Sequence, residues 1–371
     1  MLLFIFMGLP WAALLTRMPL VKSELGVTAS QLGLILIAGG IGSLVGLNII
    51  GLLVAARGTK VWIRLFFPLS TVLLLIGGLA IEAHLPLGYA IVGFFLGFSF
   101  GCVDVPVNID GTELEKITGR NLMPRLHAGY SFGTLIGSGW GALAASWHLG
   151  IMQTILPLAI LQLIAPFLVA KYLPVGIGIE TKHHEDAKPA HWFAPVLVLF
   201  GLGILGITLA EGGAGDWMTL GFKEGYGATE AQAGIGFSIF FVGMVIVRFF
   251  GGNIADRLGK GRTLQLLAGI GVLGILLVIF SSTNLVLGWV GAGLWGAGVA
   301  LGFPLFISAA GEGENSARRV SFVASWGYGA FLAGPPILGL VADAIGMLNM
   351  FYVMAGFMVV ALFASAAVRN K

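Results

Sequence analysis

Apolar stretches long enough to cross a lipid bilayer follow one another along the whole chain, and they constrain the fold more than any other feature. A helix that crosses a hydrocarbon core of about 30 Å needs about 20 mostly apolar residues. Hydrophobic residues make up 57% of the 371 residues and charged residues only 10%. A water-soluble domain of this size would not have enough polar residues to cover its surface. We expect twelve spans, at residues 1–18, 31–54, 62–83, 86–109, 126–147, 150–172, 193–214, 230–253, 262–281, 284–308, 319–341 and 346–368.

These spans are expected to be helices, because strands of a membrane barrel run about 9–11 residues and alternate in polarity. The sequence therefore predicts an all-α integral membrane protein embedded in a lipid bilayer. Met1 leads directly into Leu2, Leu3 and Phe4 without a basic flank. We therefore expect the sequence to begin inside the first helix and not with a cleaved signal peptide.

Lysine and arginine indicate the orientation, because cytoplasmic loops of membrane proteins carry an excess of them. With the amino terminus inside, only Arg17, Lys22 and Lys223 fall on the outer side. Both termini are therefore expected in the cytoplasm. The net charge of +3 then reflects membrane topology, and we expect no nucleic-acid partner.

The only long polar stretch, residues 173–192, divides the chain into two six-helix halves, 1–172 and 193–371. Its segment Lys182–Glu185 contains two adjacent histidines, which lack the spacing of a preformed metal site. We interpret the stretch as a solvated cytoplasmic linker, and we expect neither a metal nor a cofactor.

The two halves share residue types at corresponding places. Three residues recur 198 positions later in the chain: Gly93 as Gly291, Pro106 as Pro304 and Arg120 as Arg318. Pseudo-symmetric halves of this kind are typical of transporters that rock two bundles around a site near the middle of the membrane.

A short motif in the second half carries a family resemblance. Residues 252–259, with Asp256 and Arg257, read G-x-x-x-D-R-x-G, while Ala55 and Ala56 replace the Asp and Arg in the first half. The motif resembles a loop signature of the major facilitator superfamily. Longer segments resemble the YbjJ-type bacterial inner membrane proteins, a branch related to the fucose and other sugar:proton symporters; they are residues 11–28, 100–115, 125–135, 210–217, 302–310 and 327–339.

This resemblance implies the major facilitator fold, twelve helices in two six-helix bundles, in a bacterial inner membrane. It also implies alternating access for a small-molecule substrate. We expect the protein to act as a monomer.

Charged residues inside expected spans are candidates for function, because lipid makes them costly unless they are paired or hydrated. Asp104 lies about six residues past the middle of the fourth span, and Asn108 follows one turn later on the same face. Its counterpart in the second half is Gly302, so the shared scaffold does not require an acid there. We interpret Asp104 as a proton-coupling residue and both Asp104 and Asn108 as substrate-binding residues. A structural pairing of the Asp104 carboxylate with a neighbouring helix is the alternative.

Glu211 is expected near the outer end of the seventh span, with Asp216 just beyond it. In the superfamily fold the first and seventh helices meet at the outer side, and Arg17 lies near the outer end of the first. We therefore expect Arg17 to pair with Glu211 or Asp216 as an outer gate, with Glu211 a second proton-coupling candidate. The alternative is that the groups reach the membrane interface without meeting.

Two further charged positions lie toward the inner side. His127, near the inner end of the fifth span, is a candidate proton relay or a residue that caps the interface. Arg248 precedes the loop signature, where we expect it to reinforce a cytoplasmic gate with Asp256 and Arg257.

Small residues are candidates for helix packing, and aromatic residues are candidates for substrate binding. Gly129, Gly133, Gly137 and Gly141 mark one face of the fifth span, which indicates close helix packing. Four aromatic residues are candidates to stack on a ring of the substrate, although plain packing explains them as well: Trp11, Tyr130, Trp326 and Tyr328.

The sequence lacks a nucleotide-binding loop of the G-x-x-x-x-G-K-[ST] type, which argues against ATP as the direct energy source, and it lacks catalytic signatures. We therefore predict a transporter and not an enzyme, moving a small sugar-like or organic-acid solute by proton-coupled alternating access. A proton-driven exporter of amphipathic compounds is the first alternative. A membrane sensor on a transporter scaffold is the second.

Overall fold

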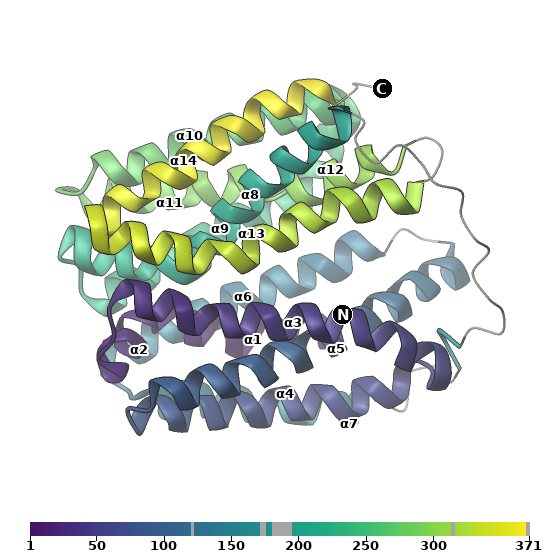
Figure 1. Cartoon of the computed structure of the whole chain (residues 1–371), viewed down its shortest axis with the longest axis horizontal. Helices are drawn as coiled ribbons and strands as arrows, with labels where there is room; N and C mark the ends of the chain where they lie inside the picture. Colours follow the sequence, from purple (N-terminus) through teal and green to yellow (C-terminus); the bar gives the residue numbers. More distant parts are fainter. Residues whose placement is uncertain (120–121, 171–175, 180–194, 313–315, 369–371) are drawn as a thin grey trace. The chain divides into compact units, whose positions relative to one another are not determined.

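The elements of the computed structural model are all helices (Figure 1), and the described residues are 1–119, 122–170, 176–179, 195–312 and 316–368. Contacts divide the chain into two compact units, Met1–Asp186 and Ala187–Lys371. The boundary falls within the expected linker at 173–192. Most of that linker, including Lys182–Glu185, lies outside the described residues.

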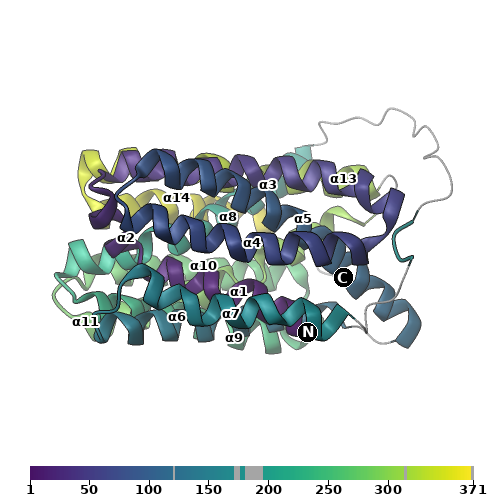
Figure 2. The same ribbon diagram turned by 90° about the horizontal axis from the view of Figure 1, so that it is seen from below.

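The first unit has a bent first span and five further long helices, which lie roughly parallel to one another in Figure 2. The bend of 57° separates α1 from α2 at Arg17. α3 packs along α5, while α1 packs against both α6 and α7. The helices are α1 (Leu2–Thr16), α2 (Met18–Leu25), α3 (Ala29–Arg57), α4 (Thr59–Glu82), α5 (Pro86–Thr118), α6 (Met123–Ser146) and α7 (Ile151–Ala170).

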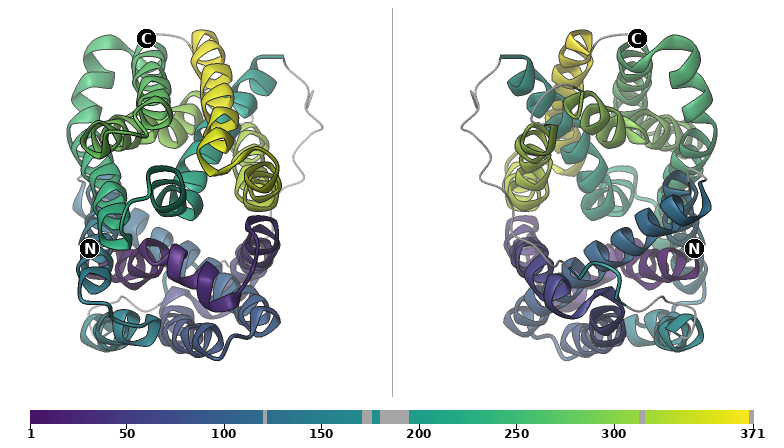
Figure 3. Two further views of the ribbon diagram at one scale, coloured as in Figure 1. Left: turned by 90° about the vertical axis from the view of Figure 1, so that its left-hand side faces the viewer. Right: turned by 90° about the vertical axis from the view of Figure 1, so that its right-hand side faces the viewer.

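The second unit repeats this arrangement, and its helices are seen end-on in Figure 3. α9 packs along α11, as α3 does along α5, and α8 packs against α13 and α14. A break at residues 300–301 separates α11 from α12. The helices are α8 (Pro195–Leu220), the π-helix η1 (Gly221–Gly225), α9 (Glu230–Leu258), α10 (Lys260–Phe280), α11 (Leu285–Val299), α12 (Gly302–Ala310), α13 (Ser316–Ile345), α14 (Met347–Ala364) and the short 3-10 helix η2 (Ser365–Ala367).

Within the described ranges, the expected spans fall on helices of the structure, with breaks at Arg17 and at residues 300–301. Among the described residues, nine helices are long and apolar enough to cross a membrane, or ten if the bent pair α1–α2 counts as one span. The remaining two expected spans correspond to α6, which is rich in glycine, serine and threonine, and to α7, which is described as an apolar helix over Ile151–Pro166. The all-helical membrane fold is therefore confirmed.

The expected end of the seventh span at residue 214 is wrong, because the helix continues through η1 to Gly225. Glycines and polar residues made this segment resemble a loop. In the structure those glycines face large apolar side chains of α14: a Cβ at Gly213 would meet Met354, and one at Gly221 would meet Phe351. Tertiary packing thus extends the helix despite weak local propensity.

Matching helix starts support the internal repeat. Thr28 caps α3 and Thr229 caps α9, each in a capping box with the glutamine three residues later. Each box follows a glycine in the left-handed region, Gly26 with φ 62° and Gly227 with φ 65°. The same local chemistry therefore starts the second span of both units.

The glycine face of α6 is a packing surface, as predicted. A Cβ at Gly133 would lie 2.1 Å from the carbonyl oxygen of Ile5, and one at Gly137 would lie 1.9 Å from that of Leu9. Both carbonyls belong to α1. The two backbones can approach this closely only because α6 has no side chain at these positions.

The described residues of the linker, 176–179, dock onto the first unit beside the start of α4. The amide of Thr59 donates to the carbonyl of Ile177 at 3.0 Å. A Cβ at Gly178 would lie 2.6 Å from Val54 and 3.7 Å from Ile109. Residues 176–179 therefore pack against the end of α3, the start of α4 and the last third of α5.

We expect Gly178→Ala to loosen this docking and Gly176→Ala to leave it in place. Both glycines have φ near +80°, so both substitutions carry similar backbone strain. Only at Gly178 does the added Cβ meet a neighbour, whereas nothing lies within 4 Å at Gly176. Hydrogen-exchange mass spectrometry should show faster exchange around Thr59 in Gly178→Ala alone; equal exchange in both variants would mean that residues 176–179 do not protect this amide.

Candidate functional site

Asp104 lies near the middle of α5, since the helix continues past the expected end at 109 to Thr118. Its carboxylate oxygen Oδ1 accepts a hydrogen bond from the Asn108 amide at 3.1 Å, and the same amide donates to the Asp104 carbonyl at 2.8 Å. The prediction that the two side chains share one face is confirmed. Among the described residues, Asp104 has no cationic partner, so its carboxylate is held by a neutral amide.

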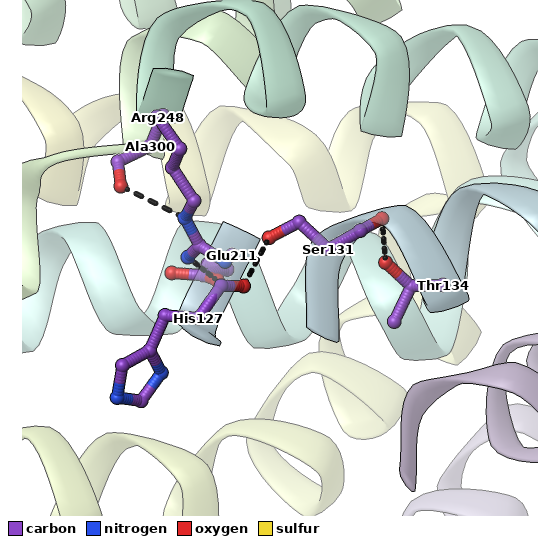
Figure 4. Close-up of polar contacts among 6 residues, drawn as sticks. All are labelled: His127, Ser131, Thr134, Glu211, Arg248 and Ala300. Atoms are coloured by element: carbon purple, nitrogen blue, oxygen red, sulfur yellow. Dashed lines mark hydrogen bonds and ion pairs between the residues drawn. The ribbon is translucent and has the colours of Figure 1, made fainter. Parts of the chain in front are cut away.

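Glu211 and Arg248 form an ion pair inside the second unit. Arg248 of α9 donates from Nη2 to Oε1 of Glu211 on α8 at 2.9 Å. Its Nε donates to the carbonyl of Ala300 at 3.1 Å, and Ala300 lies at the break between α11 and α12. Figure 4 shows the Arg248 side chain between these two acceptors. One guanidinium thus links α8, α9 and the broken tenth span.

Glu211 lies deeper in the seventh span than the sequence predicts. Because α8 and η1 run from Pro195 to Gly225, Glu211 lies in the middle of this span and not near its outer end. Asp216 lies inside the same helix and not beyond it. Among the described residues Asp216 has no hydrogen bond or ion pair.

Arg17 lies at the bend between α1 and α2 and is only 2% exposed. Its Nη2 donates to the carbonyl of Leu149 at 2.7 Å, and its Nη1 donates to the hydroxyl of Thr154 at 3.4 Å. These contacts fasten the bend to the start of α7. The outer gate that joins Arg17 to Glu211 or Asp216 stays a prediction.

His127 lies in the first turns of α6, with its ring exposed and packed edge-on against Phe4 at a centroid distance of 5.3 Å. Its carbonyl accepts a bond from Ser131, whose own carbonyl accepts from Thr134 (Figure 4). These are bonds within one helix. The proton-relay role of His127 stays a prediction.

The aromatic candidates occupy different environments. Tyr130 packs against the apolar core of the first unit, and Trp11 on α1 is half-buried. Trp326 lies against α8, because a Cβ at Gly201 would meet its ring at 2.7 Å. Tyr328 is 37% exposed. Packing therefore accounts for Trp326 and Tyr130, and a stacking role stays a prediction for all four.

Asp256 and Arg257 are exposed at the end of α9, about eight and nine residues beyond Arg248, or about 12 Å along the helix axis. Arg248 instead reaches inward to Glu211. The cytoplasmic gate formed with Asp256 and Arg257 stays a prediction.

Sequence reasoning missed a pair of polar contacts that occupy corresponding corners of the two units. In the first unit the hydroxyl of Thr59 donates to Asp110 at 2.5 Å. In the second, Lys260 donates to Ser308 at 2.9 Å and to Glu312 at 2.7 Å. A comparison of the two halves would have found the signal, since Lys260 follows Gly259 as Thr59 follows Gly58.

The arrangement provides titratable and hydrogen-bonding groups inside helices of membrane-spanning length. In the part of the chain that the structure describes, no group of three or more His, Cys, Asp or Glu side chains is placed to hold a metal ion. Carboxyl groups at this depth can exchange a proton, and amide and guanidinium groups can bind a polar solute.

Comparison with known proteins places this geometry among membrane transporters. The family model for the Major Facilitator Superfamily matches residues 192–370. An uncharacterized MFS-type transporter of Yersinia pestis is 30% identical over 348 residues, which cover 92% of this chain and 88% of the relative. An uncharacterized transporter of Sinorhizobium fredii is 30% identical over 359 residues, 95% of this chain and 93% of the relative.

Solved structures share the fold over the whole chain. The nucleoside transporter NupG superposes with a TM-score of 0.75 at 16% identity and covers 100% of this chain and 98% of its own. The E. coli fucose:proton symporter FucP superposes with a TM-score of 0.62 at 18% identity, with the same coverage. At these identities the likeness concerns the fold alone.

Proposed function

Because the chain belongs to the major facilitator superfamily of transporters, we propose that it moves a small polar solute, sugar-like or an organic acid, by proton-coupled alternating access. The family consists of transporters and not of enzymes, so the chain is a multi-pass secondary transporter. The proposal includes the class of solute, the coupling to a proton and the monomeric state. It also includes a location in the bacterial inner membrane with both termini in the cytoplasm, and a closer relation to the YbjJ-type proteins.

The observation that carries the proposal is the environment of Asp104. A carboxyl near the middle of a spanning helix, held by the neutral amide of Asn108, can gain or lose a proton without breaking an ion pair. Glu211 differs, because it is paired with Arg248 at 2.9 Å, so a proton could be carried there only by breaking that ion pair. Asp104 therefore fits a proton carrier better than Glu211 does.

Two proteins that share the fold carry solutes of the proposed class. NupG is described as a nucleoside transporter and FucP as a fucose:proton symporter. Both solutes contain a sugar ring. Within the second unit, the paired donor and acceptor groups of Glu211 and Arg248 suit hydroxyl groups of such a ring.

A binding screen tests this function. Purified full-length protein is heated in detergent with sugars, sugar acids, nucleosides and common drugs, because a ligand that binds the folded state raises the melting temperature. Stabilisation by a sugar, nucleoside or sugar acid, followed by its uptake into proteoliposomes driven by a pH gradient, is the expected result. Stabilisation by drugs alone would favour the exporter, and binding without transport would favour the sensor.

A further inference from the structure

Charges in the middle of the spanning helices are mostly acidic. Among the described residues, four charged side chains lie more than eight residues from either end of their helix or continuous span, three carboxyls and one guanidinium. They are Asp104, Glu211, Asp216 and Arg248.

The single guanidinium is already neutralised. Arg248 pairs with Glu211 at 2.9 Å, and its Nε is occupied by the Ala300 carbonyl at 3.1 Å. The ion pair is three-quarters or more buried, with side-chain exposures of 20% and 24%. A solute carboxylate would have to displace Glu211 to reach this cation.

The other acid in the middle of α8 disfavours an anion in the second unit further. Asp216 lies five residues after Glu211 and has no ion pair among the described residues. When ionised it repels a carboxylate, and when protonated it offers no charge to balance one. A buried anion without a compensating cation is strongly disfavoured.

We propose, on the basis of the transport function inferred above, that the solute carries no carboxylate: it is a hydroxyl-rich compound that is neutral or bears an amine. Hydroxyl groups both donate and accept hydrogen bonds, so they can use the neutral Glu211–Arg248 pair without opening it. An ammonium group would gain from the carboxylate of Asp216. The ion pair thus acts as a filter against organic acids.

Matched sugars test this charge preference. Thermal shifts are measured for D-glucose, D-glucosamine and D-glucuronate, and for the corresponding galactose and mannose series. The neutral sugar or its amino derivative is expected to bind at least tenfold more tightly than the uronic acid in any series that binds. A uronic acid that binds more tightly than its neutral parent would overturn the inference while leaving the transport function intact.

A second measurement does not depend on finding the solute. Acetate and gluconate are compared with chloride at equal ionic strength. The wild-type protein is expected to show no specific rise in melting temperature with the carboxylates. Glu211→Gln keeps a hydrogen-bond acceptor but leaves Arg248 without its ion pair. This variant should therefore show a rise in melting temperature that saturates with carboxylate concentration.

The double variant Glu211→Gln/Arg248→Gln is the control, and it should lose that gain. Gel filtration of each variant reports whether it is folded, and Asp216→Asn serves as a second single substitution that leaves the Arg248 pair intact. Two outcomes would show that the ion pair is not the filter. One is a saturable stabilisation of the wild-type protein by carboxylates, and the other is the absence of such stabilisation in a folded Glu211→Gln variant.

Discussion

Asp104→Asn is expected to abolish accumulation of solute against a gradient while leaving solute exchange across the membrane intact. Asparagine keeps the shape and an oxygen that can accept the bond from Asn108 at 3.1 Å, but it cannot titrate. A proton crossing 100 mV supplies about 2.3 kcal/mol, which sustains a concentration ratio of about 50-fold. In the variant this ratio should fall to about one.

The measurement uses proteoliposomes with an imposed pH gradient and the ligand that the binding screen identifies. Glu113→Gln is the matched control, because it also removes a carboxylate from α5 but from a partly exposed site where Lys116 is the partner at 3.2 Å. The control should accumulate solute as the wild type does. If Asp104→Asn still concentrates solute, the coupling acid lies elsewhere, and Glu211, His127 and Asp216 become the candidates.

The membrane fold could be predicted from the sequence because one physical requirement dominates it. Each span must be apolar over about 20 residues, and long helices such as α3 and α10 satisfy this with hardly any charge. The glycine face of α6 was equally predictable, because small residues at helical spacing indicate close backbone contact.

Depth and partners of the charged residues could not be predicted in the same way. Glu211 was placed too far out because the glycines after it, such as Gly213 and Gly221, weaken the helical signal, and only Met354 and Phe351 on another helix make the segment continuous. The partnership with Arg248 depends on the packing of α8 against α9. No sequence pattern encodes that contact between distant segments.

Asp104 and Asn108 illustrate the opposite case. The two residues are four positions apart in one helix, so helical periodicity alone predicts that their side chains meet. Local geometry can be deduced from spacing, whereas contacts such as Arg17 with Leu149 require the tertiary structure.

Gly137→Leu is expected to destabilise the first unit severely, by about 3 kcal/mol or more, whereas Gly139→Leu is expected to be tolerated. A Cβ at Gly137 would lie 1.9 Å from the Leu9 carbonyl oxygen, so α1 and α6 would have to separate. Overpacking of a core typically costs about 1–3 kcal/mol, and backbone cannot yield as a side chain can. At Gly139 nothing lies within 4 Å and the position is exposed.

The two positions form a matched pair, since both lie inside α6 and both exchange glycine for a strong helix former. Helix propensity therefore favours both variants equally, by up to about 1 kcal/mol, and any difference between them reports the contact with α1. Melting temperature and monodispersity in detergent are the readouts, with Gly137→Ala as a milder step in the same direction. Equal melting temperatures for Gly137→Leu and Gly139→Leu would mean that α1 and α6 do not meet at Leu9, and the packing of the first span would have to be revised.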